Sequence, residues 1–105
     1  MSIEQIDSMV NAASLRVFGE AATFEQGGNA RVIFTDQRSA VMLGLAPADA
    51  PAPVISLTMT ELQRLGAHEG STVVVRGISY TLMEGGSDAV ADAGGMAHLR
   101  IRQYA

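Results

Sequence analysis

Residues 70–82 read Gly-Ser-Thr-Val-Val-Val-Arg-Gly-Ile-Ser-Tyr-Thr-Leu, and this stretch decides the class of fold. Its three consecutive valines predict a strand, because β-branched side chains pack well on a pleated surface. Gly77 then breaks the run, and a glycine at this place permits a tight turn. A second strand follows, in which Ile78, Tyr80 and Leu82 alternate with polar residues. The stretch therefore predicts two antiparallel strands joined at Gly77.

The segment just before this hairpin predicts a short helix at residues 60–65, Thr-Glu-Leu-Gln-Arg-Leu. Thr60 and Gln63 have the spacing of a capping box, in which two side chains satisfy free amide groups of the first turn. The two leucines point to the same side, and Gly66 is placed to end the helix.

Further strands are predicted before and after the segment formed by residues 60–82. Apolar and polar residues alternate from Ala21, and Gly27-Gly28 marks a hairpin turn before the next strand. The additional predicted strands are residues 21–25, 31–38, 54–59 and 97–104. Short strands with glycine-rich turns predict a mostly β, antiparallel sandwich or barrel spanning residues 20–105 as a single domain.

An N-terminal helix is predicted over residues 1–19. Ser2 and Gln5 have capping-box spacing, and Gly19 is placed to end the helix. Its apolar stripe is formed by Ile3, Ile6, Val10, Ala13 and Val17. This helix can be a core element or can dock on a neighbouring subunit, and the sequence leaves both readings open.

Two segments, residues 39–53 and residues 85–95, show no clear period. The first contains all three prolines, which cannot donate to a strand ladder, and its second half has almost no large side chains. The second is rich in glycine and acidic residues. Both are expected to be mobile loops.

The composition narrows the classes of function. The 105 residues suffice for one domain, all seven basic residues are arginines, and the net charge is −4. The absence of cysteine excludes disulfides and thiolate metal sites, and the absence of lysine excludes Schiff-base catalysis. An acidic chain is a poor match for nucleic acid or for an anionic membrane. The acidic start of the chain does not resemble a signal peptide, so we expect the protein in the cytoplasm unless a particle carries it out.

No catalytic, cofactor or metal site is expected. The two histidines, His68 in a turn and His98 on the last strand, have no cluster of further ligands around them. A solvated position is expected for His68, and a solvated or interface role for His98. The acidic residues are scattered singly, although folding can still bring pairs together. The glycine-rich segment at residues 85–95 lacks the lysine of a phosphate loop and carries two aspartates that would repel an anion.

The centre of the chain resembles a known family. The capped helix at residues 60–65 leads to Gly-x-x-Val at residues 70–73 and then to Gly-x-x-Tyr-x-Leu at residues 77–82. This succession is similar to that of the tail attachment (head–tail joining) proteins of lambda-like phages and prophages, and the order of elements agrees from about residue 21 to residue 101. The chain departs from the pattern at its end, because no basic tail follows the last strand.

The resemblance implies a non-catalytic structural protein of the virion neck that is present in the host cytoplasm during assembly. It also implies a homo-oligomeric ring in the particle, formed from chains that can be monomers alone. The ring would contact a head-completion or portal protein on one side and a tail-end protein on the other.

Two groups of residues are candidates for the subunit interface. Met42, Leu43 and Leu45 are apolar residues of the first loop without an obvious place in the core, and the alternative is that they only anchor that loop. Arg100 and Arg102 lie on one face of the last strand and could pair with acids of another subunit, or simply be solvated.

Two other functions remain open from the sequence. One is a different phage morphogenesis role with the same class of fold, such as a tail terminator or a minor tail protein. The other is an accessory, small-molecule-binding β domain of a bacterial enzyme or transporter.

Overall fold

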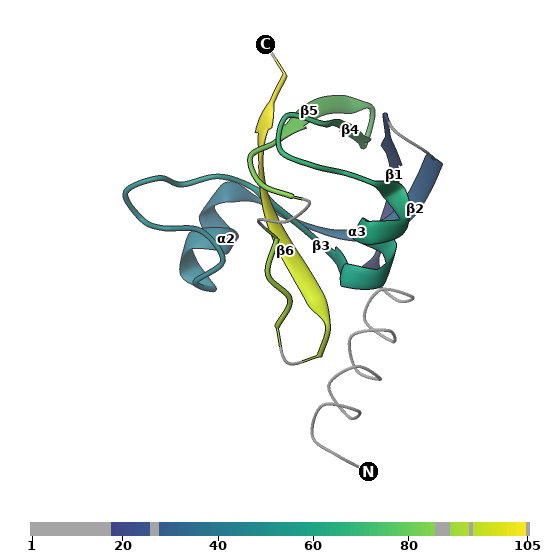
Figure 1. Ribbon diagram of the computed structural model, residues 1–105. Helices are drawn as coiled ribbons and strands as arrows, with labels where there is room; N and C mark the ends of the chain where they lie inside the picture. The colour runs from purple at the N-terminus through teal and green to yellow at the C-terminus, as the bar shows by residue number, and fades with distance from the viewer. Residues whose placement is uncertain (1–17, 26–27, 86–88, 93, 105) are drawn as a thin grey trace.

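Six antiparallel strands close into a barrel in the order β1-β2-β3-β6-β5-β4 (Figure 1). The computed structural model describes residues 18–25, 28–85, 89–92 and 94–104. The elements are β1 Glu20–Phe24, β2 Gly28–Thr35, α2 Gln37–Met42, β3 Val54–Thr58, α3 Met59–Leu65, β4 Thr72–Val75, β5 Ile78–Leu82 and β6 Met96–Gln103. The mostly β, antiparallel prediction is confirmed, and the alternative between a sandwich and a barrel is decided for the barrel. The predicted helix at residues 1–19 falls almost entirely outside the described residues.

The barrel closes where β1 pairs with β4. Ala22 lies opposite Val75, and Phe24 lies opposite Val73, in an antiparallel register. Each of the six strands therefore has a strand neighbour on both sides, and the sheet has no free edge.

The core follows the alternation predicted for the central hairpin. Val73 and Val75 of β4 point into the barrel together with Tyr80 and Leu82 of β5, whereas Ile78 at the start of β5 is exposed. The α3 helix closes the end of the barrel where β3 finishes, because its two leucines join the same core. The largest fully buried side chains are Phe24, Val32, Val54, Ile55, Leu57, Leu62, Val73, Val75, Leu82, Leu99 and Ile101.

The turn between β4 and β5 consists of Arg76 and Gly77, which both have positive φ, 54° and 76°. Two central residues in this region form the hairpin turn that matches the twist of the strands. The positive φ of Arg76 is unusual for a residue other than glycine. Its guanidinium donates to both carboxylate oxygens of Glu20, at 2.7 and 2.8 Å, and lies 4.7 Å from the centre of the Phe34 ring. These contacts help to offset the cost of the conformation.

The strand predicted at residues 31–38 is displaced by three residues toward the C-terminus, because β2 spans Gly28–Thr35. β2 ends at Thr35, and Asp36 caps the helix α2, which was not predicted. The Asp36 carboxylate accepts a hydrogen bond from the Ser39 backbone N–H at 2.8 Å. The hydrogen bonds from Ser39 lower the pKa of Asp36 below its ordinary value. A side chain that accepts a hydrogen bond from a first-turn backbone N–H stabilises the start of a helix. The chain therefore leaves the strand and begins a helix at Asp36.

The start of α3 also differs from the prediction, since the cap is Thr58 and not Thr60. The Thr58 hydroxyl oxygen accepts from the Glu61 backbone N–H at 3.2 Å, and Met59 belongs to the helix instead of the preceding strand. Thr58 and Glu61 have capping-box spacing as well, so the sequence contained two overlapping signals. The predicted end at Gly66 is confirmed, with φ of 65°.

Because Thr58 and not Thr60 caps α3, replacing the two threonines should have different effects on stability. Thr58→Ala should lower the free energy of unfolding by about 1 kcal/mol, because a helix donor loses its partner. Thr60→Ala, the matched control inside the helix, should change it by less than about 0.5 kcal/mol. Urea denaturation measures both values, and an equal or larger loss in Thr60→Ala would show that the cap is misassigned.

Candidate functional site: an assembly surface

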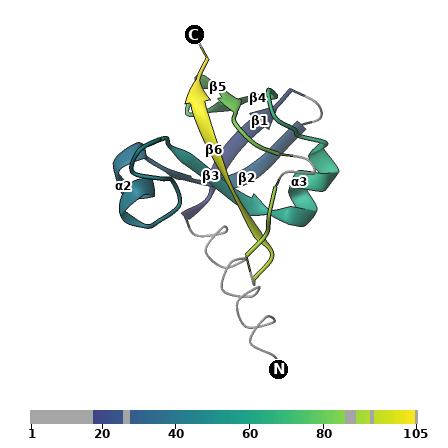
Figure 2. The same ribbon diagram turned by 60° about the vertical axis from the view of Figure 1, so that its left-hand side comes forward.

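The segment between β2 and β3 projects from the barrel wall as a helix and a loop (Figures 1 and 2). We call residues 37–53 the protrusion. Its base is a small second core in which Ala40, Ala46 and Val54 are buried and Val41 and Leu45 are partly buried. The backbone N–H groups of Leu45 and Ala46 both donate to the Ala40 carbonyl, at 2.8 and 3.2 Å. The protrusion is thus anchored to the barrel beside β3.

The three apolar residues proposed for the interface lie in different environments within the protrusion. Leu45 packs partly against the second core, so it serves the anchoring role that the sequence left open. Met42 and Leu43, at the end of α2, are 77% and 68% exposed. These two side chains contribute little to the fold of a single chain and are available to a partner.

The two arginines proposed for the interface also differ. Arg100 is held within the chain by Glu84, whose carboxylate accepts from the Arg100 backbone N–H at 2.9 Å and from its side chain at 3.3 and 3.4 Å. Arg102 is exposed, and it has no side-chain hydrogen bond or ion pair within the described part of the chain. Arg102 is therefore the arginine of this pair that is free to meet another molecule.

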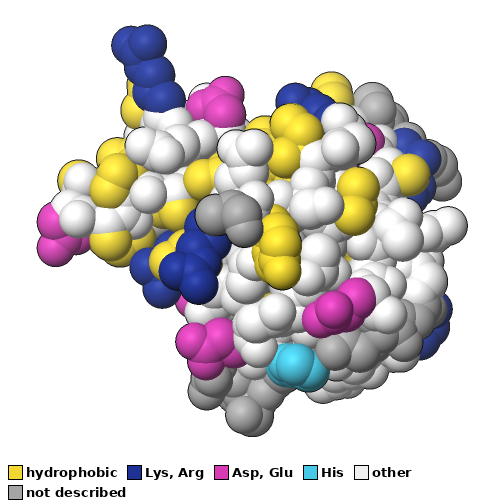
Figure 3. Space-filling view, turned by 90° about the horizontal axis from the view of Figure 1, so that it is seen from above, with side chains coloured by type: hydrophobic (Ala, Val, Ile, Leu, Met, Phe, Trp, Pro, Cys, Tyr) yellow, Lys and Arg dark blue, Asp and Glu magenta, His cyan; other side chains and the backbone are white. Residues whose placement is uncertain are grey.

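The open end of the barrel holds a hollow of about 430 Å³. It lies where β2 and β6 end and β3 begins, whereas α3 covers the other end of the β3–β6 pair. We call this hollow the barrel mouth. Figure 3 looks onto this end of the molecule, where hydrophobic side chains gather between arginines. The lining residues are Phe34, Asp36, Gln37, Pro51, Ala52, Pro53, Tyr80, Met83, Ile101, Arg102 and Gln103.

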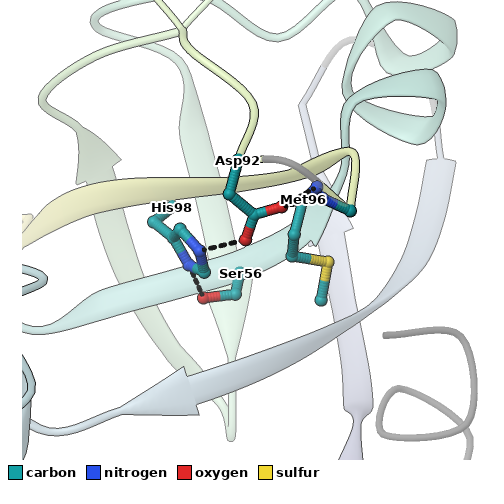
Figure 4. A network of polar contacts seen from close by, with 5 residues as sticks. Ser56, Asp92, Met96 and His98 are labelled. Carbon is teal, nitrogen blue, oxygen red and sulfur yellow. Dashed lines mark hydrogen bonds and ion pairs between the residues drawn. The ribbon is translucent and has the colours of Figure 1, made fainter. Parts of the chain in front are cut away.

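A polar network joins the last connection of the chain to the barrel wall (Figure 4). The Ser56 hydroxyl lies 2.7 Å from His98 Nδ1, and His98 Nε2 lies 3.1 Å from Asp92 Oδ2. Ser56 and His98 face each other across β3 and β6, 42 residues apart in sequence. Sequence reasoning expected only a solvated or interface role for His98 and missed this pairing, because the strand register that creates it is not local.

The same three groups, in a different arrangement, perform acyl transfer in serine hydrolases. Here, however, Ser56 is 4% exposed within the barrel wall. A hydroxyl in that position does not meet a substrate, and its hydrogen bond to the imidazole satisfies a buried polar group instead. The network is best explained as a structural tie.

Asp92 is the centre of this tie. Its carboxylate also accepts from the backbone N–H groups of Gly94 and Met96, at 3.0 and 2.9 Å. Partial burial acts to raise the pKa of Asp92, but the hydrogen bonds from Met96, His98 and Gly94 outweigh it and hold the pKa below its ordinary value. The carboxylate therefore stabilises the turn that leads into β6.

Other kinds of site are not apparent in the described ranges. No group of three or more histidine, cysteine, aspartate or glutamate side chains there could hold a metal ion. No helix among those residues is long and apolar enough to cross a membrane.

Comparison with known families decides the relationship. The family model for the phage head–tail attachment protein matches residues 3–101. The chain belongs to this family. The match covers nearly the whole chain, including both the protrusion and the barrel, and it confirms the resemblance seen around residues 60–82. No curated protein shows a significant match.

Membership of the head–tail attachment family gives the chain a structural role in the phage neck. A protein with such a role acts through the surfaces that contact other subunits. Two surfaces stand out among the described residues: the exposed pair Met42 and Leu43, and the barrel mouth with Arg102 at its rim.

The role of Asp92 leads to a prediction about pH. Asp92→Ala should lower the free energy of unfolding by about 1 kcal/mol at neutral pH, because three donors lose their acceptor. Since folding lowers the pKa of Asp92, its contribution is fully present above the ordinary pKa of 3.8. It is lost as the pH falls through the lower pKa of the folded state, so the two proteins should converge in acid.

Denaturation of wild type and Asp92→Ala from pH 7 down to strong acid measures this difference. Asp49→Ala is the matched control, because Asp49 is an exposed aspartate of the protrusion. A difference between wild type and Asp92→Ala that stays constant with pH would contradict the assignment.

Proposed function

We propose that this chain joins the DNA-filled head to the tail as a ring of identical subunits in the virion neck, without catalysing a reaction. Family membership supports the neck role. The absence of cysteine and lysine removes two common nucleophiles and supports a structural function.

The partners in this proposal are a head-completion or portal protein on one side of the ring and a tail-end protein on the other. The subunits would meet these partners in the host cytoplasm and remain in the finished virion.

The first segment expected to be mobile, residues 39–53, begins within the helix α2, so assembly is proposed to order only its loop after Met42, together with residues 85–95. Each segment already has one fixed point, the second core under α2 and the Asp92 tie. The rest of each segment would adjust to a partner on binding, so that one joining step would prepare the next.

The exposure of Met42 and Leu43 carries the proposal, because two large apolar side chains at the end of an anchored helix are expected to be buried by a partner. Burial of each such side chain contributes about 1.5–3 kcal/mol. The double variant Met42→Ser, Leu43→Ser should therefore keep its fold but lose joining activity by about tenfold or more.

In-vitro complementation measures this activity: purified protein is added to heads and tails that lack it, and infectious particles are counted. Val90→Ser is the matched control, because Val90 is 81% exposed but lies outside the protrusion. Circular dichroism and thermal unfolding check that both variants are folded. Full activity of the folded double variant would refute the proposed role of this pair.

A further inference from the structure

We propose that the protrusion of one copy docks into the barrel mouth of the next copy, with Met42 and Leu43 against the apolar lining and Asp49 beside Arg102. This inference rests on the proposed ring and names the contact that would build it. It assigns the exposed tip of the protrusion and the barrel mouth to one another.

The barrel mouth has the composition of a receptor for an apolar tip. The rings of Phe34 and Tyr80 meet within it, with their centres 5.9 Å apart. Pro51 and Pro53 add aliphatic surface to the lining. A concave, largely apolar site with a few polar groups at its rim is the usual form of a binding pocket, and barrel mouths often provide one.

The protrusion has the composition of the matching tip. Met42 and Leu43 stand at its end, while the second core beneath Ala40 keeps the helix in place. Because the helix is already formed and anchored, little ordering entropy opposes docking. A flexible methionine beside a leucine also adapts readily to an irregular apolar hollow.

The charges of the two surfaces complement each other. Two charged residues line the mouth: Asp36 is engaged in capping α2, and Arg102 has no hydrogen bond or ion pair among the described residues. Glu69 borders a neighbouring hollow together with Arg102 but forms no ion pair with it. On the protrusion, Asp49 is exposed and likewise has no such partner within the described residues. The protrusion also carries Arg38, which lies on α2 two residues after the capping Asp36. An Asp49–Arg102 pair would join one exposed charge from each surface.

The geometry makes this contact heterologous, since a tip on one copy meets a different surface on the next. Gln37, at the start of α2, belongs to the mouth, whereas Met42 and Leu43 lie at the opposite end of that helix. A heterologous contact repeats from copy to copy, and it closes into a ring when the rotation between copies allows. The proposed neck ring requires a contact of this kind.

Disulfide trapping tests the contact directly, because the natural chain has no cysteine. Ala48→Cys places a thiol on the exposed loop of the protrusion beside Asp49, and Gln103→Cys places one at the rim of the mouth beside Arg102. The double variant is added to heads and tails in reduced form and is oxidised after joining. Chains linked into dimers and larger oligomers are expected, and a 1:1 mixture of the two single variants should yield dimers only.

Val90→Cys combined with Gln103→Cys is the matched control, with an exposed thiol outside the protrusion. Arg102→Glu in the trapping variant should reduce the yield of linked chains, and Asp49→Arg added to it should restore the yield. Recovery by the reversed pair would separate a direct contact from a general loss of fold.

Linkage no greater than that of the Val90→Cys control in joined particles would overturn the docking contact. Dimers formed by Ala48→Cys alone would also overturn it, because they would indicate a two-fold contact between protrusions. In both cases, particles joined by the same chains would leave the proposed neck function standing. Failure of the wild-type chain to join heads to tails would instead overturn the function itself.

Discussion

The pairing of β1 with β4 is the interaction on which the rest of the molecule depends. It joins Ala22 and Phe24 to the two inward valines of β4 and closes the barrel. Closure satisfies the backbone groups that an open sheet would expose at its edges. The subunit therefore cannot recruit a partner by adding a strand, and its contacts must be made by side chains on loops and at the barrel ends.

This constraint explains why the protrusion and the mouth are the prominent features. The α3 helix fills one end of the barrel with buried leucines, whereas the other end is left open above Phe34 and Tyr80. The long connection between the adjacent strands β2 and β3 carries α2, whose end exposes Met42 and Leu43. A stable body with one projecting apolar tip and one apolar hollow is suited to repeated assembly.

The sequence predicted what depends on near neighbours. Alternation around Gly77 identified the central hairpin, and Gly66 identified the end of α3, because turns and caps are local. Asp36 was missed because the apolar alternation of β2 runs directly into its cap, which extended the strand prediction. The choice between Thr58 and Thr60 failed because both threonines have suitable spacing.

What the sequence could not predict depends on strand register. Ser56 meets His98 only because β3 lies beside β6. Glu84 pairs with Arg100, whereas Arg102 on the same face has no ion pair among the residues that the structure describes. Likewise, the apolar pattern could not separate Leu45 from Met42 and Leu43, since their difference arises from the second core formed with Val54.

Hydrogen exchange can show whether the closed barrel joins through its protrusion and mouth. Exchange is compared between the free protein and the protein in joined particles. After joining, the backbone amides of the protrusion should exchange more slowly, with little change in the central strand amides, which are already paired. Unchanged exchange in the protrusion, with new protection confined to other parts of the chain, would contradict this mode of joining.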